Sequence, residues 1–305
     1  MSGCVYNYIY KSSVDINIML ESGSIDYIKG VYVDRLQEAN NQVTVYTTNK
    51  AGTSETRAFD RVFLAAGAVN STKIVLTSKD IFNEKVLLKS TVGFVAPMFR
   101  FKRSSLGAFS VNTQPGLFFD FKVPGLSNHW VHSQVSTPNE LVLAKLKVDI
   151  KKTGLVNSIK KWLVSHLVVA NCNLHSNHSN GYELHIEKGV DGGVNLISNR
   201  ELGPEARKAI KQSIWQFFKL GLKFGCYTLL PFIQDSLKSG GYHVGGSLPM
   251  KLKPEKETDT NIMGNPKGWN LINVVDSSIF PSLPGTTIGL LAMANATRIA
   301  MEVEL

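Results

Sequence analysis

Short β-rich segments alternate with polar turns in the first sixty residues. Segments 25–36 and 43–48 are rich in β-branched and aromatic residues, and Asn40 and Asn41 lie between them. Two such segments joined by a short asparagine turn are typical of neighbouring antiparallel strands. The pattern therefore predicts a meander at the start of the chain.

The next segment predicts a strand, a tight turn and a helix in immediate succession. Residues 62–66 are all apolar, as in a strand that is buried on both faces. The strand ends at Gly67, after which Asn70 or Ser71 is expected to cap a helix over 72–78. A turn of this kind presents backbone N–H groups to a phosphate or a cofactor.

The middle of the chain, from about residue 91 to 200, shows strand patterns and one helix, expected near 155–169. Because polar turns join the strands, we expect an antiparallel sheet. Pro97 lies inside the first strand and cannot donate to a ladder, which predicts an edge strand or a bulge there. The expected strands are 94–101, 118–123, 130–135, 168–174, 182–187 and 194–198.

The last third begins with a long helix and returns to a strand and a second helix. Pro204 opens the long helix in its first turn, and Gly225 lies near its end. Glycine-rich loops precede a short strand over 271–275 and a closing helix over about 288–302. These elements predict a mixed α/β fold in which helices flank an antiparallel sheet.

Composition narrows the class of protein. The 305 residues are 43% hydrophobic and 19% charged, which excludes a disordered chain and allows one large or two ordinary domains. No apolar run reaches the roughly 18–20 residues of a membrane span, and the N-terminus lacks a signal-peptide pattern. Cys4, Cys172 and Cys226 are too scattered for a disulfide framework, so we expect a cytoplasmic protein.

The chain is basic, with 33 Lys and Arg against 24 Asp and Glu and a net charge of +9. Such a charge is compatible with a nucleic-acid partner. The lysines are dispersed, however, and those between 208 and 223 lie on one amphipathic helix, where a solvated face is the ordinary arrangement. No zinc-finger or aromatic RNA-binding motif accompanies them, so we expect no nucleic acid.

The glycine pattern excludes two common phosphate-binding elements. The 25 glycines include no Gly-x-Gly pair, and no Gly-x-x-x-x-Gly-Lys motif is present. These 305 residues therefore lack the usual turn that binds a dinucleotide pyrophosphate.

Histidines offer two candidate sites. His175, His178 and His185 are compatible with a metal site or with a hairpin that carries polar side chains; no cysteine completes a ligand pattern, so we expect no metal. His243 lies in the glycine-rich loop 239–250, where the backbone can approach a flat ligand closely. An imidazole there suits a general base near neutral pH, although a structural histidine in a turn would have the same pattern.

Four segments resemble a known family. Residues 241–250 (Gly-Tyr-His-Val-Gly-Gly-Ser-Leu-Pro-Met), 271–281 and 293–300 resemble the C-terminal signature of the GMC (glucose–methanol–choline) flavin oxidoreductases. Residues 60–71 resemble the internal flavin-contact strand of that family. The segments occur in the family's order, and the resemblance covers nearly all of this chain but only about the C-terminal two-thirds of a family member.

The resemblance implies an activity and a domain organisation. GMC enzymes bind FAD and oxidise a CH–OH group, here of an alcohol or a sugar, with hydride passing to flavin N5. His243 falls on the catalytic base that accepts the hydroxyl proton. The flavin-side layer would comprise residues 1–88 and 265–305, and the substrate domain residues 89–264.

The resemblance also implies which residues contact the cofactor. Ala66 and Gly67 fall on backbone contacts to FAD. Asp276 and Ser277 fall at the strand end that meets the ribityl and pyrophosphate region.

Two features depart from the family pattern. Where the family has a second His or Asn near the flavin, this chain has Thr286 or Thr287, whose hydroxyl can hydrogen-bond a substrate oxygen but cannot share a proton as an imidazole can. The family's first βαβ unit, with its glycine-rich turn, would lie before Met1, so a second chain is expected to supply it in a split enzyme. The alternative is a non-catalytic remnant or subunit that binds a carbohydrate or a partner chain.

Overall fold

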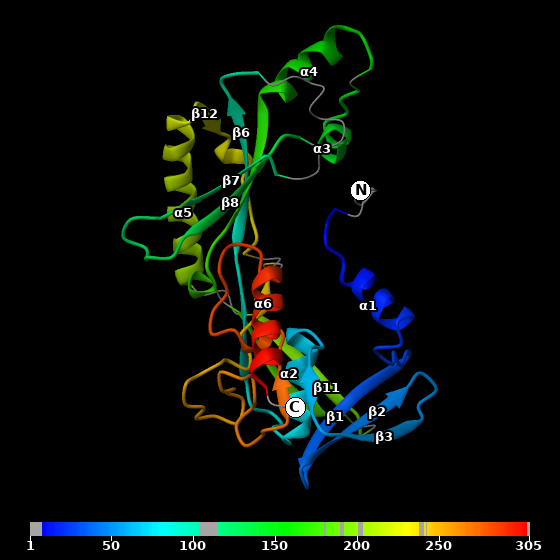
Figure 1. The fold of residues 1–305 in the computed structure, drawn as a ribbon. Coiled ribbons are helices and arrows are strands. Elements are labelled where there is room, and N and C mark those ends of the chain that lie inside the picture. The colour runs from blue at the N-terminus through cyan, green and yellow to red at the C-terminus, as the bar shows by residue number, and fades with distance from the viewer. Residues whose placement is uncertain are drawn as a thin grey trace.

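The computed structural model describes residues 8–103, 115–138, 140–149, 151–179, 181–189, 192–200, 204–237, 241 and 243–303. Figure 1 shows an elongated molecule, with a long sheet and α5 (Pro204–Lys223) towards one end and α2 (Ala68–Ser78), a small meander and the C-terminus towards the other. The expected mixed α/β fold with antiparallel sheets is confirmed.

Segments from distant parts of the sequence form one layer at the lower end of Figure 1. β4 (Val62–Leu64) pairs in parallel with β15 (Ile272–Val274). α2 and α6 (Gly289–Glu302) contribute Ile74 and Ile299 to the same hydrophobic core as these two strands. The apolar faces of both helices therefore stabilise the strand pair by removing surface from water.

β4 is less buried than its sequence predicts. Residues 62–66 were expected to be covered on both faces, but only Leu64 is buried and Phe63 is 41% exposed. The expectation was wrong for the described residues because β15 is the only described strand that pairs with β4, which leaves the other edge of β4 open.

The helix after β4 begins earlier than expected. Gly67, at a φ of +83°, is the N-cap residue, and α2 starts at Ala68. Asn70 and Ser71 therefore lie inside the first turn and do not cap the helix. A residue with a side chain would be strained at this φ, so the glycine permits the abrupt passage from strand to helix.

The meander has three strands rather than two: β1 (Val31–Ala39), β2 (Gln42–Asn49) and β3 (Ser54–Phe59). The predicted turn at Asn40 and Asn41 is confirmed, and both asparagines have positive φ, as a tight hairpin requires. A helix that was not predicted, α1 (Ser12–Glu21), precedes the meander and buries no residue.

The larger sheet has α5 packed on one face. Phe217 of α5 meets Phe94 with ring centroids 5.8 Å apart, and Ala209 and Ile210 belong to the same buried core. The strand order is β12 (Cys226–Thr228), β6 (Gly93–Arg100), β9 (Leu167–Asn173), β8 (Val131–Ser136) and β7 (Leu117–Phe121), and β13 (Gln234–Asp235) also pairs with β6.

Pro97 lies in an interior strand whose register with β9 is unbroken, so the expectation of an edge strand or a bulge was wrong. β6 pairs with β9 along one side and with β12 and β13 along the other. The Pro97 carbonyl accepts a hydrogen bond from Leu229 N (2.9 Å), just where η3 (Leu230–Phe232), a 3₁₀ turn, separates β12 from β13. The missing N–H of the proline thus faces the break between two short strands.

A smaller sheet packs against α2, because Ala68 and Leu76 of the helix share a buried core with Val86, Leu88, Leu184 and Ile186 of the sheet. Its order is β11 (Val194–Arg200), β10 (Tyr182–Lys188), β5 (Val86–Ser90) and β14 (Val244–Gly245). The remaining elements are α3 (Glu140–Lys145), α4 (Leu155–His166), η2 (Ser176–His178) and η4 (Ser277–Ile279).

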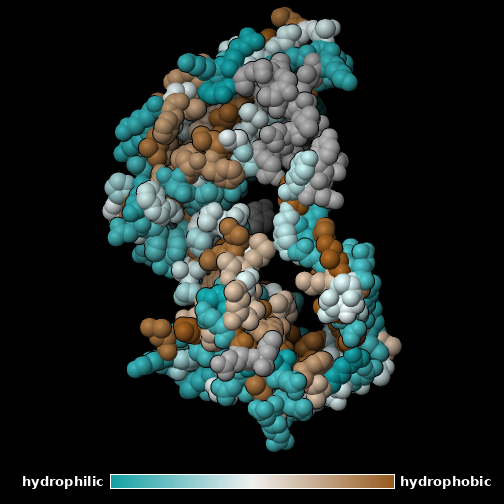
Figure 2. Space-filling model, viewed as in Figure 1, coloured by the Kyte–Doolittle hydropathy of each residue, from teal (hydrophilic) through white to brown (hydrophobic). Residues whose placement is uncertain are grey.

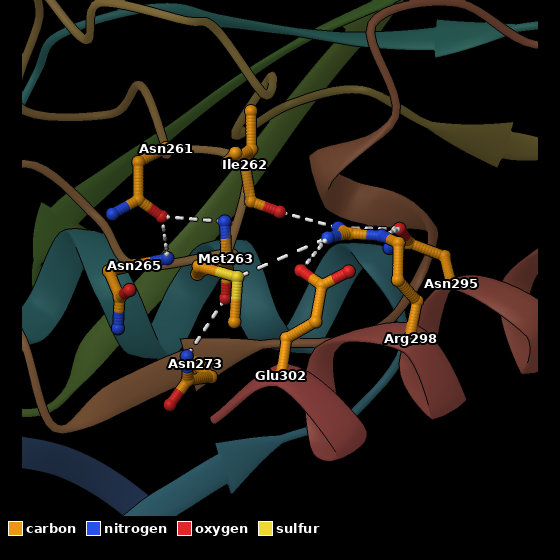
Figure 3. Close-up of polar contacts among 8 residues, drawn as sticks. All are labelled: Asn261, Ile262, Met263, Asn265, Asn273, Asn295, Arg298 and Glu302. Atoms are coloured by element: carbon orange, nitrogen blue, oxygen red, sulfur yellow. Dashed lines mark hydrogen bonds and ion pairs between the residues drawn. The ribbon is translucent and has the colours of Figure 1, made fainter. Parts of the chain in front are cut away.

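Polar side chains fasten the loop 261–265 to β15 and α6 (Figure 3). Asn273 Nδ2 donates to the Met263 carbonyl (2.8 Å), and Asn261 Oδ1 accepts from Met263 N (2.9 Å). Arg298 of α6 donates to the Ile262 carbonyl. These contacts fix the position of the C-terminal helix on the layer that contains β4 and β15.

Large hydrophobic side chains remain exposed on two helices. Leu290 and Met301 of α6 are 74% and 80% exposed, and Ile18 of α1 is 59% exposed. Figure 2 shows these helices as hydrophobic areas of the surface. In the part of the chain that the structure describes, no helix has the length and apolar character needed to span a bilayer.

Candidate functional site

Close backbone contacts hold the loop that contains His243. Ser277 Oγ donates to the Val244 carbonyl (2.9 Å), and Gly246 N donates to the Ser277 carbonyl (2.9 Å). A Cβ atom on Gly245 would collide with that same carbonyl. The glycines therefore allow the loop to lie directly on η4, and His243 follows this placement.

His243 is half-buried, and its Nδ1 atom is buried without a hydrogen-bond partner among the described residues. Burial, and then the positive charge of His132, lowers the pKa of His243 below its usual value. The imidazole is therefore neutral at pH 7 and able to accept a proton.

Sequence reasoning did not find a second histidine, His132, which is near enough to His243 for its charge to act on it. His132 of β8 pairs directly with Asp120 of β7, and the two side chains meet at 2.8 Å between Nδ1 and Oδ1. Gln134 Nε2 lies 3.4 Å from His132 Nε2. The carboxylate holds the imidazole in one orientation and favours a proton on Nδ1.

The alternation along β8 places these polar groups on the face away from α5. Val131 belongs to the buried core with Phe217 of α5, so His132 and Gln134 project from the opposite face. The sequence does carry a signal for His132 and Gln134: in the predicted strand 130–135 they are the polar residues that alternate with apolar or small ones. The register that joins Asp120 to His132 is not readable from the sequence.

The segment with the two candidate threonines lies against the same strand ends. A Cβ atom on Gly285 would lie 3.3 Å from His132 N and 3.1 Å from the Asn173 carbonyl carbon. The side chains of Thr286 and Thr287 are exposed. The structure thus brings Gly285, next to the two threonines, to His132, and His132 is also near enough to His243 for its charge to lower the pKa of His243.

Asp276 is occupied by four hydrogen bonds from its own chain. Its Oδ2 accepts from Gly67 N (2.9 Å) and Ser71 Oγ (2.5 Å), and its Oδ1 accepts from Ser278 N (2.9 Å) and Ser278 Oγ (2.6 Å). Since a carboxylate has about four acceptor positions, none is left for a ligand. The side chain joins the turn after β4 to the end of β15.

A cavity of about 950 Å³ adjoins the open edge of β4. Five consecutive residues, 62–66, line it, although neighbouring side chains of a strand point to opposite faces. The strand edge itself therefore forms the wall. Asn70 and Lys73 of α2 line the cavity on the side of the helix, and exposed Ala66 and Gly67 lie where the two elements meet.

His175 and His178 of the histidine run cluster with His129, whereas His185 lies on β10 and pairs with Glu187 (2.9 Å). The rings of His129 and His175 are parallel at 3.7 Å, and His178 Nε2 lies 2.5 Å from Ser127 Oγ. Burial and the charges of His129, His178 and Lys89 lower the pKa of His175 to about 4. Within the described residues, no three His, Cys, Asp or Glu side chains are arranged to hold a metal ion.

Comparison with known proteins gives a likeness of fold. No protein-family model and no curated protein matches the sequence. The structure is similar to pyridoxine 4-oxidase from Mesorbium loti (TM-score 0.55, 14% identity, 89% of this chain and 57% of that one). It is also similar to an FAD-dependent oxidoreductase from Chaetomium thermophilum (TM-score 0.54, 10% identity, 93% of this chain and 62% of that one).

The chain thus spans about three-fifths of the length of these two structures. At these identities the likeness concerns the fold alone.

Proposed function

We propose that this chain is part of an FAD-dependent oxidoreductase of the GMC type that oxidises a CH–OH group of an alcohol or a sugar. The observation that carries the proposal is His243, a neutral imidazole whose buried Nδ1 has no partner in the described structure. An unpaired buried nitrogen costs free energy, so a substrate hydroxyl that hydrogen-bonds the imidazole would stabilise this arrangement. The likeness of fold supports a flavin chemistry.

His243 would act as the general base. The substrate hydroxyl donates to the imidazole, and its proton moves to the ring as hydride leaves the carbon that bears the oxygen. The lowered pKa of His243 keeps the ring unprotonated at neutral pH, as this step requires.

The neighbouring groups would hold the substrate. Thr286 or Thr287 is exposed and can hydrogen-bond the substrate oxygen. His132, oriented by Asp120, and Gln134 lie on the same face of the sheet and together can hold a second hydroxyl, which suits a polyol or a sugar.

The described residues fit part of an FAD molecule. The 950 Å³ cavity is of ligand size, and Lys73 in its wall suits a phosphate. Ala66 and Gly67 would contact the cofactor through their backbone, and Ser277 would lie near it. When bound, FAD supplies the acceptor for the hydride.

The partner we propose is a βαβ unit with a Gly-x-Gly-x-x-Gly turn, carried by polypeptide outside these 305 residues. Its first strand would pair with the open edge of β4 and fill part of the cavity there. Without that unit, three or more phosphate hydrogen bonds of about 1.5–3 kcal/mol each are lost, which weakens FAD binding by several powers of ten. The chain alone should purify colourless, and a yellow preparation near full occupancy would contradict this.

The test uses the complemented protein, which is this chain co-expressed with a βαβ unit and loaded with FAD. The βαβ unit is sought first in the reading frame upstream of Met1. Anaerobic flavin reduction by alcohols and sugars is followed at 450 nm. His243→Gln should slow it about 10²- to 10⁴-fold. The matched variant His185→Gln, on β10 outside the site, should leave the rate unchanged. Equal rates for His243→Gln and the parent would remove His243 from the mechanism.

A second candidate function is a non-catalytic subunit that binds a carbohydrate or a partner chain. The open edge of β4 and the absence of a Gly-x-Gly turn favour it. Two results would support this function. The chain alone would bind a sugar in calorimetry, and the complemented protein would take up FAD, but none of the substrates tested would reduce the flavin.

A further inference from the structure

A second cavity lies at the other end of the molecule, between the large sheet and α5. Its volume is about 600 Å³, within the range of small-molecule sites. The wall is mostly apolar: Phe119 and Val168 face it from the sheet, Phe217 from the helix, and Phe224 from the turn after the helix. It lies on the α5 face of β8, whereas His132 lies on the opposite face, so this cavity is separate from the site of His243.

One charged side chain stands in this apolar wall. Arg100 ends β6, and its Nε donates to the Lys102 carbonyl (2.7 Å). Its Nη2 is buried and has no hydrogen-bond partner among the described residues. No acidic side chain in the described part of the chain forms an ion pair with it.

A buried guanidinium nitrogen without an acceptor is costly because arginine stays protonated in proteins. An anion that enters the cavity and accepts a hydrogen bond from Arg100 Nη2 would remove this cost. One guanidinium balances one negative charge, and its planar fork matches a carboxylate. No lysine lines the cavity to balance the second charge of a phosphate.

We propose that this cavity binds an unbranched fatty acid, with the carboxylate on Arg100 and the alkyl chain among the aromatic side chains of β7 and α5. The apolar wall removes the alkyl chain from water, at about 0.8 kcal/mol per buried CH₂ group. Thr137, just beyond the end of β8, lies in the same wall, and its hydroxyl can donate to the second carboxylate oxygen. Figure 2 shows hydrophobic residues on the surface near α5 and β12, where such a molecule would enter.

A cysteine provides a reporter inside the wall. Cys226 lies directly opposite Arg100 in the β12–β6 pair and is half-buried. Burial raises the pKa of its thiol, and the charge of Arg100 acts against that rise. A carboxylate bound to Arg100 would cancel the effect of the arginine charge on the Cys226 thiol and would also cover the thiol. Bound fatty acid should therefore slow the alkylation of Cys226.

Dodecanoate and dodecanol are the probes, used with the 305-residue chain as purified. Calorimetry should show dodecanoate binding about 10- to 100-fold more tightly than dodecanol, the value of one charge-assisted hydrogen bond. Arg100→Met should abolish this preference and leave dodecanol binding unchanged. Arg103→Met, the same change at an exposed arginine, is the matched control and should behave as the parent.

Two further measurements keep the test sharp. Peptide mass spectrometry after N-ethylmaleimide treatment should show that dodecanoate protects Cys226 in the parent and not in Arg100→Met. Leu117→Trp, at an exposed position of the rim, should block both probes without disturbing the core, whereas Phe118→Trp on the other face should not. Equal affinity for the two probes, no protection of Cys226, or full binding by Leu117→Trp would each overturn the proposal. None of these readouts depends on flavin or on His243.

Discussion

Asp120 of β7 and His132 of β8 lie directly opposite each other in the sheet, with 2.8 Å between the carboxylate Oδ1 and the imidazole Nδ1. The pair stands beside His243, whose pKa is lowered first by burial and then by the charge of His132. A histidine from β8 of the larger sheet thus lies next to Gly285, where the C-terminal segment itself offers only threonines.

Replacing His132 should change the pH profile of the complemented protein. In His132→Gln the positive neighbour is gone, so the pKa of His243 rises towards 6.5, and the acid limb of kcat/KM moves to higher pH. The measurement is flavin reduction between pH 5 and 8, with His185→Gln as the control. A slower enzyme with an unmoved acid limb would mean that His132 does not act on His243.

Asp276→Asn should destabilise the layer formed by both ends of the sequence. In the variant an NH₂ group takes the place of one carboxylate oxygen. This donor then lies opposite another donor, the N–H of Gly67 or of Ser278. We expect a loss of about 1.5–3 kcal/mol in the free energy of unfolding, measured by urea titration. Asp60→Asn, at an exposed turn, should change it by less than about 0.5 kcal/mol. Equal values for the two variants would contradict the role of Asp276.

Acid should weaken the fold through His175. Its pKa is about 4 in the folded chain and near 6.5 when unfolded, so between these values the unfolded chain binds more protons. The contribution is complete above pH 6.5 and is lost as the pH falls towards 4. The melting temperature should decline over this range, and His175→Gln should flatten the decline. His185→Gln should keep the slope of the parent, and an unchanged slope in His175→Gln would refute the assignment.

The open edge of β4 should make the isolated chain associate. Phe63 is 41% exposed in the cavity wall, and a lysine there opposes pairing with another strand. Phe63→Lys should therefore shift the chain towards monomer in light scattering and should also prevent complementation by the βαβ unit. Phe59→Lys, on β3 away from the cavity, should do neither. A parent chain that is already a stable monomer would count against this interface.

Local pattern predicted the larger elements of the fold because each carries its own signal. The alternation over 168–174 corresponds to β9 (Leu167–Asn173), and Pro204 marks the first residue of α5. Helix α1 was not predicted, since it buries no residue and has no apolar face. Strand β5 (Val86–Ser90) was not predicted either, because its place is decided by pairing with β10 and β14.

The candidate site was only partly predictable. The glycines around His243 are readable because a side chain cannot fit between the loop and η4. His132 was missed because its meeting with Asp120 depends on strand register, which is a property of the assembled sheet. Arg100 was missed for a related reason: a buried charge is recognised only when the acids near it, or their absence, are seen in three dimensions.

The parallel pairing of β4 with β15 has a consequence for synthesis of the protein. The hydrogen bond from Gly67 N to Asp276 joins residues 209 positions apart, so the ribosome must release the C-terminal segment before this layer can close. The antiparallel ladder of β8 and β9 needs only residues 131–173 and can form earlier on the nascent chain. Until β15 has been translated, the apolar strand β4 has no partner strand and stays exposed. During this interval we expect chaperones to bind it.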